Sequence, residues 1–191
     1  MRDLVYIASI SVDGFLGAAD ADDAWVVPDP ELHRHFNELT TTFDLNLYGR
    51  RMYELMTGYW PFAEEKEGAP DYEIEYARIW KRMPKLVFSK SLKRVEWNSR
   101  LFGGDALEEV ARLKTEAGKN LSVGGTTLAA SLARHGLIDE FRLYVMPTLV
   151  GSGTAIFGAL GRHIDLATQE VRRFDAGAVL LRYRAKKAAL V

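Results

Sequence analysis

Short apolar runs alternate with amphipathic segments along most of this chain. Five runs are rich in β-branched and aromatic residues and predict buried strands. These predicted strands cover residues 4–11, 43–48, 85–89, 120–123 and 140–146. Between them, apolar residues recur at the spacing of a helix face, over residues 30–41, 49–58, 73–83 and 106–117 and from Thr126 onward. Strands that alternate with helices indicate right-handed crossovers and a mainly parallel sheet.

The pattern changes toward the end of the chain. Residues 164–174 and 178–185 alternate between apolar and polar positions, and Asp175-Ala-Gly177 predicts the turn of a hairpin between them. A short edge strand is expected at residues 95–97, and residues 59–62 are expected to form an aromatic loop. No internal repeat or linker interrupts the pattern. We therefore expect one α/β domain over residues 1–191, with a mixed, mainly parallel sheet and a C-terminal antiparallel hairpin.

Composition narrows the classes of function. Apolar residues make up 48% of the chain and charged residues 27%, which is typical of soluble globular proteins. The net charge of −1 provides no long-range attraction to nucleic acid or to an anionic membrane. The chain has no cysteine, which excludes disulfides and cysteine-based zinc sites, and its four histidines belong to no cluster of metal ligands. The N-terminal residues are strand-like rather than a secretory leader, and no apolar stretch approaches the ~20 residues that span a bilayer, so we expect a cytoplasmic protein.

The most informative local motif is a strand that runs into a helix through two glycines. Residues 120–123 form the predicted strand, Gly124 and Gly125 end it, and Thr126 begins the helix. Two glycines allow a ligand to approach bare backbone, and the free N–H groups of a helix start favour an anion. The alternative is a tight strand–helix turn with no ligand, since short glycine motifs also recur by chance.

Other small or cationic residues follow the predicted strands and are expected to meet this turn. In open α/β sheets, ligands bind outside the carboxyl ends of the strands. The residues expected at that edge are Ser9, Ser11, Gly49, Arg50, Arg51, Ser89, Lys90, Gly124, Gly125, Thr126, Thr127, Gly151 and Gly153. Arginines in the first turn of a helix lie at the positive end of its dipole, which costs stability unless an anion binds there. The alternative is that Arg50 and Arg51 are solvated surface charges. Five segments that converge in this way favour a cofactor that carries phosphate.

The ordered set of these motifs resembles the dihydrofolate reductase-like superfamily, and within it the RibD C-terminal domain family of riboflavin biosynthesis. The resemblance covers essentially the whole chain. It is carried by Ile7-Ala-Ser-Ile-Ser-Val-Asp-Gly-Phe-Leu-Gly17, Tyr48-Gly-Arg-Arg-Met-Tyr-Glu54, Leu86-Val-Phe-Ser-Lys-Ser-Leu92, Ser122-Val-Gly-Gly-Thr-Thr127, Leu143-Tyr-Val-Met-Pro147 and Gly151-Ser-Gly153. It implies a three-layer α/β fold, a homodimer, and a reductase similar to the 5-amino-6-(5-phosphoribosylamino)uracil reductase domain.

The resemblance also implies NADPH as the cofactor and assigns residues to its parts. Ala8 and Ser9 would line the nicotinamide pocket, with Leu16 and Gly17 close by. Arg50 and Arg51, at the helix start after Gly49, would hold the adenosine phosphates, and Ser89 and Lys90 would lie by the 2′-phosphate. Residues 124–127 would hold the pyrophosphate. In dihydrofolate reductases, the paired glycines are joined by a cis peptide bond.

Two departures from the family pattern affect the expected chemistry. Dihydrofolate reductases carry an acidic residue on the first helix, whereas the matching position here is near the apolar Leu32. Glu31, His33 and His35 flank it, and one of them could donate a proton, but a solvated helix surface is the simpler interpretation of each. The zinc deaminase half of the bifunctional riboflavin enzyme has no counterpart in 191 residues without cysteine, so we expect a stand-alone reductase-like domain.

Candidate catalytic and substrate residues complete the hypothesis. Asp13 is the carboxylate expected nearest the nicotinamide and is the candidate catalytic residue, with the alternative that it only caps a turn. Trp25, Tyr53 and Trp60 could stack on a heterocyclic substrate or belong to core packing, and Gly151 and Gly153 would adjoin it. The main hypothesis is therefore an NADPH-dependent reductase of a small heterocyclic compound. The alternatives are a non-catalytic nucleotide-binding or regulatory domain and a dihydrofolate reductase.

Overall fold

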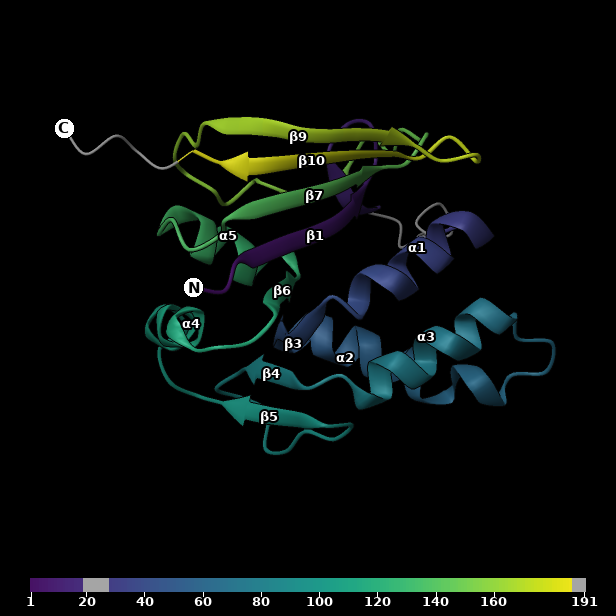
Figure 1. Ribbon diagram of the computed structural model, residues 1–191, viewed down its shortest axis with the longest axis horizontal. Coiled ribbons are helices and arrows are strands. Elements are labelled where there is room, and N and C mark those ends of the chain that lie inside the picture. Colours follow the sequence, from purple (N-terminus) through teal and green to yellow (C-terminus); the bar gives the residue numbers. More distant parts are fainter. Residues whose placement is uncertain (19–27, 187–191) are drawn as a thin grey trace.

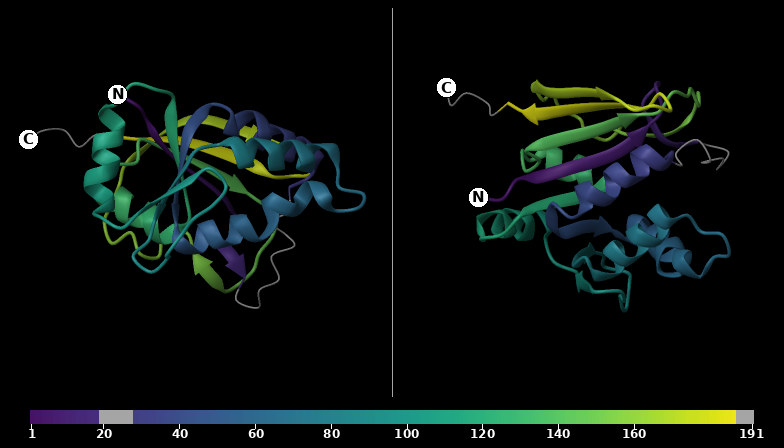
Figure 2. Two further views of the ribbon diagram at one scale, coloured as in Figure 1. Left: turned by 90° about the horizontal axis from the view of Figure 1, so that it is seen from below. Right: turned by 45° about the vertical axis from the view of Figure 1, so that its right-hand side comes forward.

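Eight strands form one twisted sheet in the order β5-β4-β3-β6-β1-β7-β10-β9 (Figure 1). The computed structural model describes residues 1–18 and 28–186. The sheet strands are β1 (Leu4–Ile10), β3 (Phe43–Gly49), β4 (Lys85–Phe88), β5 (Ser99–Phe102), β6 (Asn120–Gly124), β7 (Glu140–Val145), β9 (Leu166–Arg173) and β10 (Val179–Ala185). A separate antiparallel pair, β2 (Phe15–Ala18) and β8 (Gly153–Ala155), lies beside the main sheet (Figure 2).

The sheet is mainly parallel, as the alternation of strands and helices predicts. β5, β4, β3, β6, β1 and β7 pair in parallel, whereas β10 is antiparallel to both β7 and β9. The registers align the strand ends, since Tyr48 lies opposite Gly124, Gly49 opposite Phe88 and Ile10 opposite Val145. The carboxyl ends of the parallel strands therefore share one edge, which we call the carboxyl edge. The C-terminal hairpin is confirmed as well.

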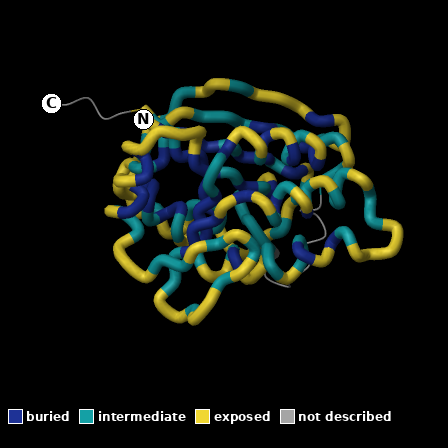
Figure 3. Tube along the Cα trace, turned by 60° about the horizontal axis from the view of Figure 1, so that its bottom comes forward, coloured by how far each residue is buried: buried dark blue, intermediate teal, exposed yellow. Residues whose placement is uncertain are grey.

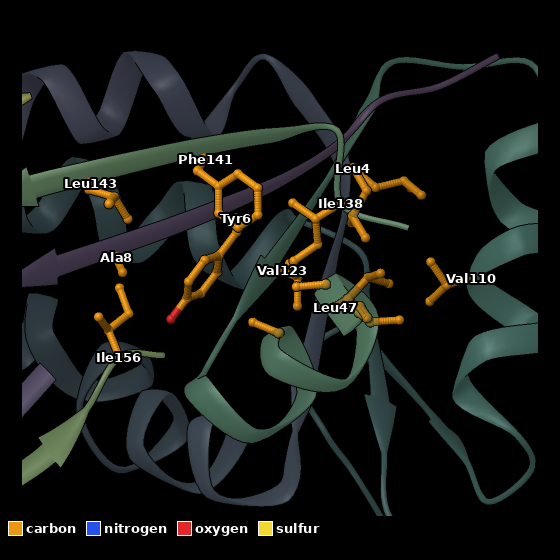
Figure 4. Packing of buried hydrophobic residues seen from close by; sticks show 14 of the residues in the cluster. Leu4, Tyr6, Ala8, Leu47, Val110, Val123, Ile138, Phe141, Leu143 and Ile156 are labelled. Atoms are coloured by element: carbon orange, nitrogen blue, oxygen red, sulfur yellow. The ribbon is translucent and has the colours of Figure 1, made fainter. Parts of the chain in front are cut away.

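Helices cover both faces of the sheet and make three layers. On one face lie α1 (Pro30–Thr40), α2 (Arg50–Tyr59), the 3₁₀ helix η2 (Trp60–Glu65) and α3 (Asp71–Arg82), and on the other lie α4 (Ala106–Thr115) and α5 (Thr126–Arg134) (Figure 1). Strand side chains alternate between the faces. Tyr6 packs with the α4–α5 layer (Figure 4), whereas Val5 packs with Leu32 of α1. The central strands are consequently the most buried, whereas β9 and the outer connections are largely exposed (Figure 3). Among the described residues, no helix is long and apolar enough to cross a membrane.

Two predicted segments were wrong. The strand expected at residues 95–97 lies instead at Ser99–Phe102, because Trp97 and Asn98 adopt left-handed φ angles of 60° and 54° that break an extended run. The buried ammonium of Lys85 binds the Trp97 carbonyl oxygen at 2.8 Å and holds this bend in place. The aromatic loop is the helix η2 rather than a loop. The β2–β8 pair was not predicted, since its strands are too short for a periodic signal.

Candidate functional site

Two helices begin side by side at the carboxyl edge. α2 follows β3 at Gly49, and α5 follows β6 at Gly125. A Cβ placed on Gly49 would lie 3.9 Å from the Cβ of Leu128 in α5, and one placed on Gly125 would lie 3.3 Å from the Cβ of Met52 in α2. The first turns of α2 and α5 therefore pack against each other through glycine, and their N–H groups open at the same edge.

Within residues 1–18 and 28–186, no side chain closes either helix start. Carboxylates accept the first N–H groups of α1 and α4, which are capped by Asp29 and Asp105. The caps of α2 and α5 are Gly49 and Gly125, which provide no side-chain hydrogen bond, and neither first turn contains an acidic residue. Uncapped N–H groups together with the positive end of the helix dipole form a site for an anion such as phosphate.

Cationic side chains lie next to these helix starts. Arg50 and Arg51 are exposed in the first turn of α2, and neither forms an ion pair with any residue in the described part of the chain. Ser89 directly follows β4, next to the strand that leads into α2, and its Oγ accepts N–H groups of Ser91 and Leu92 in a tight turn. Lys90 is exposed in the same turn. Unpaired guanidinium and ammonium groups beside two open helix starts are the donor set that phosphate groups favour.

The glycine pair has the predicted place but not the peptide geometry of dihydrofolate reductases. Gly124 ends β6, and Gly125 has a φ of +87°, which glycine adopts without steric cost. The described residues contain no cis peptide bond, so the bond between Gly124 and Gly125 is trans. Thr126 and Thr127 form the first turn of α5, and Thr127 is exposed at the edge.

The end of β1 supplies the other side of the site. Ala8 is buried on the α5 face, and Ser9 pairs with Tyr144 of β7 in the sheet. Ser11 is fully buried, and its Oγ accepts the N–H of Phe15 at 3.0 Å, which turns the chain into β2. Leu16 and Gly17 lie in β2 and are partly buried. These residues lie at the carboxyl edge as expected, and their role toward a nicotinamide stays a prediction.

The carboxylate of Asp13 is engaged by the protein. It accepts the N–H groups of Gly151 at 2.7 Å and Val150 at 3.2 Å, and so ties the loop after β1 to the loop after β7. Hydrogen bonds from Ser11 and from these backbone groups hold the pKa of Asp13 below its usual value. An ionised, occupied carboxylate is a poor proton donor. The N–H of Gly151 is therefore already bonded to Asp13. Gly153 of β8 pairs with Ala18 of β2.

The polar residues that flank Leu32 on α1 also have partners. His33 is 5% exposed and shares a hydrogen bond with Asn37, and burial lowers its pKa. His35 is half-buried and lies 2.7 Å from the Tyr144 hydroxyl, and burial lowers its pKa as well. Glu31 pairs with Arg172 and accepts the N–H of Asp175. The expectation of a solvated surface was therefore wrong for both histidines, because α1 packs against α3 and the sheet on more than its apolar face.

The aromatic candidates are engaged in packing. Tyr53 is buried against Tyr48 and Val87, and its hydroxyl binds the backbone of Glu96. Trp60 packs against His33 and Tyr76 between α1 and α3. Both rings contribute to packing, but Tyr53 is buried whereas Trp60 is partly exposed, and their role toward a substrate stays a prediction. Trp25 lies outside the described residues.

Two surface hollows have similar sizes, and only their positions distinguish them. One of about 360 Å³ opens at the carboxyl edge, between the start of α1, the end of β7 and the hairpin turn. It is lined by Pro28, Asp29, Met146, Pro147, Thr148, Ala176 and Ala178. The other, of about 350 Å³, lies at the opposite edge, near the end of α3. The first is the candidate substrate side, because ligands bind at the carboxyl ends of such sheets. The described residues hold no cluster of histidine and carboxylate groups suited to a metal.

Comparison with known families agrees with this geometry. The family model for the RibD C-terminal domain matches residues 2–180. The chain belongs to the RibD C-terminal domain family. Two relatives come from Bacillus subtilis (strain 168). YyaP is 30% identical over 183 residues, which covers 95% of this chain and 94% of YyaP. YwjB is 27% identical over 192 residues and covers 95% of this chain and 97% of YwjB.

Solved structures confirm the fold of this RibD C-terminal domain. A protein of Shewanella sp. PV-4 named for riboflavin biosynthesis superposes with a TM-score of 0.78 at 19% identity, covering 97% of this chain and all of that one. The Thermotoga maritima diaminohydroxyphosphoribosylaminopyrimidine deaminase/5-amino-6-(5-phosphoribosylamino)uracil reductase superposes with a TM-score of 0.66 at 15% identity. That match covers 97% of this chain but 57% of the Thermotoga chain. At these identities the likeness concerns the fold.

Proposed function

We propose that this RibD C-terminal domain protein is an NADPH-dependent reductase that transfers hydride to a small heterocyclic compound. The cofactor, when bound, would supply the hydride. The open starts of α2 and α5 would bind its phosphates, with Arg50, Arg51 and Lys90 on the adenosine side. Ala8 and Ser9 would orient the nicotinamide at the end of β1. The task of the protein is then to orient the cofactor and exclude water.

One observation carries this proposal. Carboxylate side chains cap α1 and α4, and α3, which has no side-chain cap, carries Asp71 and Glu73 in its first turn. The adjacent α2 and α5 have neither a side-chain cap nor an acidic first turn, and the cations beside them form no ion pair within the described residues. Cations at a helix start oppose the dipole and cost stability unless an anion compensates them. A dinucleotide with a 2′-phosphate provides such anions along one molecule.

The activity is tested by following oxidation of NADPH with a panel of acceptors: a pterin, a pyrimidine precursor of flavins and a quinone. We expect steady turnover with at least one acceptor and a higher KM for NADPH in Arg51→Ala. Arg173→Ala is the matched control, since Arg173 is also exposed but lies on β9 at the end of the sheet. A rise in KM that is equal in both variants would contradict the proposed cofactor site.

A second candidate is a nucleotide-binding domain without catalysis. It is favoured by the apolar Leu32, near which the resemblance places the family acid. The neighbouring side chains of Glu31, His33 and His35 are hydrogen-bonded within the protein. Hydride transfer to an already polarised carbonyl or iminium group needs less help from an acid, so this observation does not remove the reductase proposal. Tight binding of NADPH with no turnover across the whole panel would favour the non-catalytic candidate.

A further inference from the structure

The Gly124–Gly125 turn rests on the side chains of two other elements. A Cβ placed on Gly124 would lie 3.4 Å from Cε1 of Tyr48 and 3.4 Å from Cγ of Met52. Tyr48 lies directly opposite Gly124 in the register of β3 and β6 and is 5% exposed. The Tyr48 ring therefore packs against the side of the turn that has no side chain of its own.

A short chain of buried polar groups ends on this ring. The Tyr48 hydroxyl accepts a hydrogen bond from Nδ2 of Asn46 at 3.2 Å, and Oδ1 of Asn46 accepts one from the Ser122 hydroxyl at 2.5 Å. Asn46 and Ser122 lie opposite each other on β3 and β6, two residues before Tyr48 and Gly124. All three polar residues are buried. The chain thus joins the two strands directly before the point where one of them turns.

These polar groups constrain one another. A buried polar group costs free energy unless it is hydrogen-bonded, so each member favours the rotamers of its neighbours that keep the bonds. Burial also raises the pKa of Tyr48 to about 12, so its hydroxyl is protonated near neutral pH. Apolar side chains at these positions would make no such hydrogen bonds, so the polar chain gives the Tyr48 ring a defined position.

We propose that the buried chain of Ser122, Asn46 and Tyr48 positions the Gly124–Gly125 turn for a dinucleotide. The three are positioning residues, because they are buried and act on the turn through the Tyr48 ring. This inference rests on the proposed function, in which the turn holds the pyrophosphate of NADPH. It predicts that removing a single buried hydroxyl changes the affinity for the cofactor at a distance.

Tyr48→Phe removes the hydroxyl and keeps the ring. We expect the dissociation constant for NADPH, measured by fluorescence titration, to rise by about three- to tenfold, as for residues that modulate a site without contacting the ligand. Ser122→Ala breaks the other end of the chain and should act in the same direction. Tyr6→Phe is the matched control, because Tyr6 is 1% exposed and its hydroxyl has no hydrogen-bond partner among the described residues (Figure 4). It should leave the dissociation constant within about twofold of the wild-type value.

A second probe separates this role from a general loosening of the fold. Adenosine 2′-monophosphate has no pyrophosphate and should depend on the cations after β3 and β4 rather than on the glycine turn. Its affinity should be the same in the wild type, Tyr48→Phe and Tyr6→Phe. A loss of affinity for NADPH but not for this fragment in Tyr48→Phe supports the positioning role.

Two results would overturn the inference. If Tyr48→Phe and Ser122→Ala both bind NADPH as tightly as the wild type, or bind both probes more weakly to the same degree, the chain has only a structural role while the proposed function stands. If the wild type does not bind NADPH, the proposed function fails and this inference fails with it. The wild-type titration distinguishes the two cases.

Discussion

Asp13 is placed at the nicotinamide side of the proposed site, yet its carboxylate is occupied by the loop after β7. Its two oxygens accept N–H groups of Val150 and Gly151, and these bonds together with one from Ser11 lower its pKa. His33 and His35, the other titratable side chains near the start of α1 that could move a proton, are hydrogen-bonded to Asn37 and Tyr144. At the scale of single residues, the polar groups around the site mainly hold its walls together.

Replacing Asp13 tests whether it clamps or catalyses. We expect Asp13→Asn to keep kcat/KM within about tenfold of the wild type, because a general acid typically contributes about 10²- to 10⁴-fold and a clamp does not. The pH profile of kcat should also keep its shape. A loss of about a thousandfold, together with the disappearance of one limb of the pH profile, would show that Asp13 is the proton donor.

His33 predicts a pH dependence of stability. Burial lowers its pKa in the folded protein below the ordinary value of 6.5, so the unfolded chain binds a proton more readily. The stability from neutral His33 is therefore present above about pH 6.5 and is lost as the pH falls below that value. We expect the urea-unfolding free energy of the wild type to fall between pH 7.5 and 5.5 (roughly one pH unit on either side of that pKa), and to fall less steeply in His33→Gln. His135→Gln, at an exposed position, is the control, and equal slopes in all three proteins would contradict the assignment.

At the scale of elements, the turn between β6 and α5 should tolerate a side chain poorly. Gly125 has a φ of +87°, and an added Cβ would lie 3.3 Å from the Cβ of Met52. We expect Gly125→Ala to lower the unfolding free energy by about 1–3 kcal/mol. Gly58 in α2 is the matched control, since an added Cβ there meets nothing within 4 Å. Gly58→Ala should be stabilising by about 0.5–1 kcal/mol, and the reverse order of the two variants in urea unfolding would contradict the described backbone.

Elements with a strong period were predictable, and short ones were not. Apart from β5, the parallel strands and α1 to α5 follow from the apolar pattern, as does the hairpin of β9 and β10. β2 and β8 pair with each other only because the loops after β1 and β7 meet in space. The displaced β5 depends on the backbone of Trp97 and Asn98, which is held by the distant Lys85. Contacts of this kind leave no periodic trace in the sequence.

At the scale of the whole molecule, segments that are far apart in the sequence supply the residues of the proposed site at the carboxyl edge. The general rule for parallel sheets placed Gly49 to Arg51, Ser89, Lys90 and the glycine pair together, and the strand registers agree. The rule says nothing about which side chains remain available once packing is complete. The rule therefore could not show that Tyr53 and Trp60 pack within the protein while Arg50 and Arg51 stay exposed. It also could not show that the Tyr48 ring packs against the glycine turn.

The same whole-molecule view predicts the absence of one activity. Leu32, near which the family acid is expected, is fully buried, and the neighbouring carboxylate of Glu31 is bonded to Arg172 and to the N–H of Asp175. We expect little or no NADPH oxidation with dihydrofolate, because nothing on this helix binds and protonates a pterin. A turnover of roughly 10 per second, typical of enzymes, would show that this reasoning is wrong.

The central claim is that the carboxyl edge binds NADPH through the cations beside the open starts of α2 and α5. The most direct measurement is a titration of NADPH and NADH into the wild type, Arg51→Ala and Lys90→Ala at low and high salt. Two charge-assisted hydrogen bonds to the 2′-phosphate, at about 1.5–3 kcal/mol each, would give NADPH an advantage of about a hundredfold or more in the wild type. That advantage should shrink in at least one variant and as salt rises. Equal affinities of the wild type for NADPH and NADH would contradict the account and would leave these cations as ordinary surface charge.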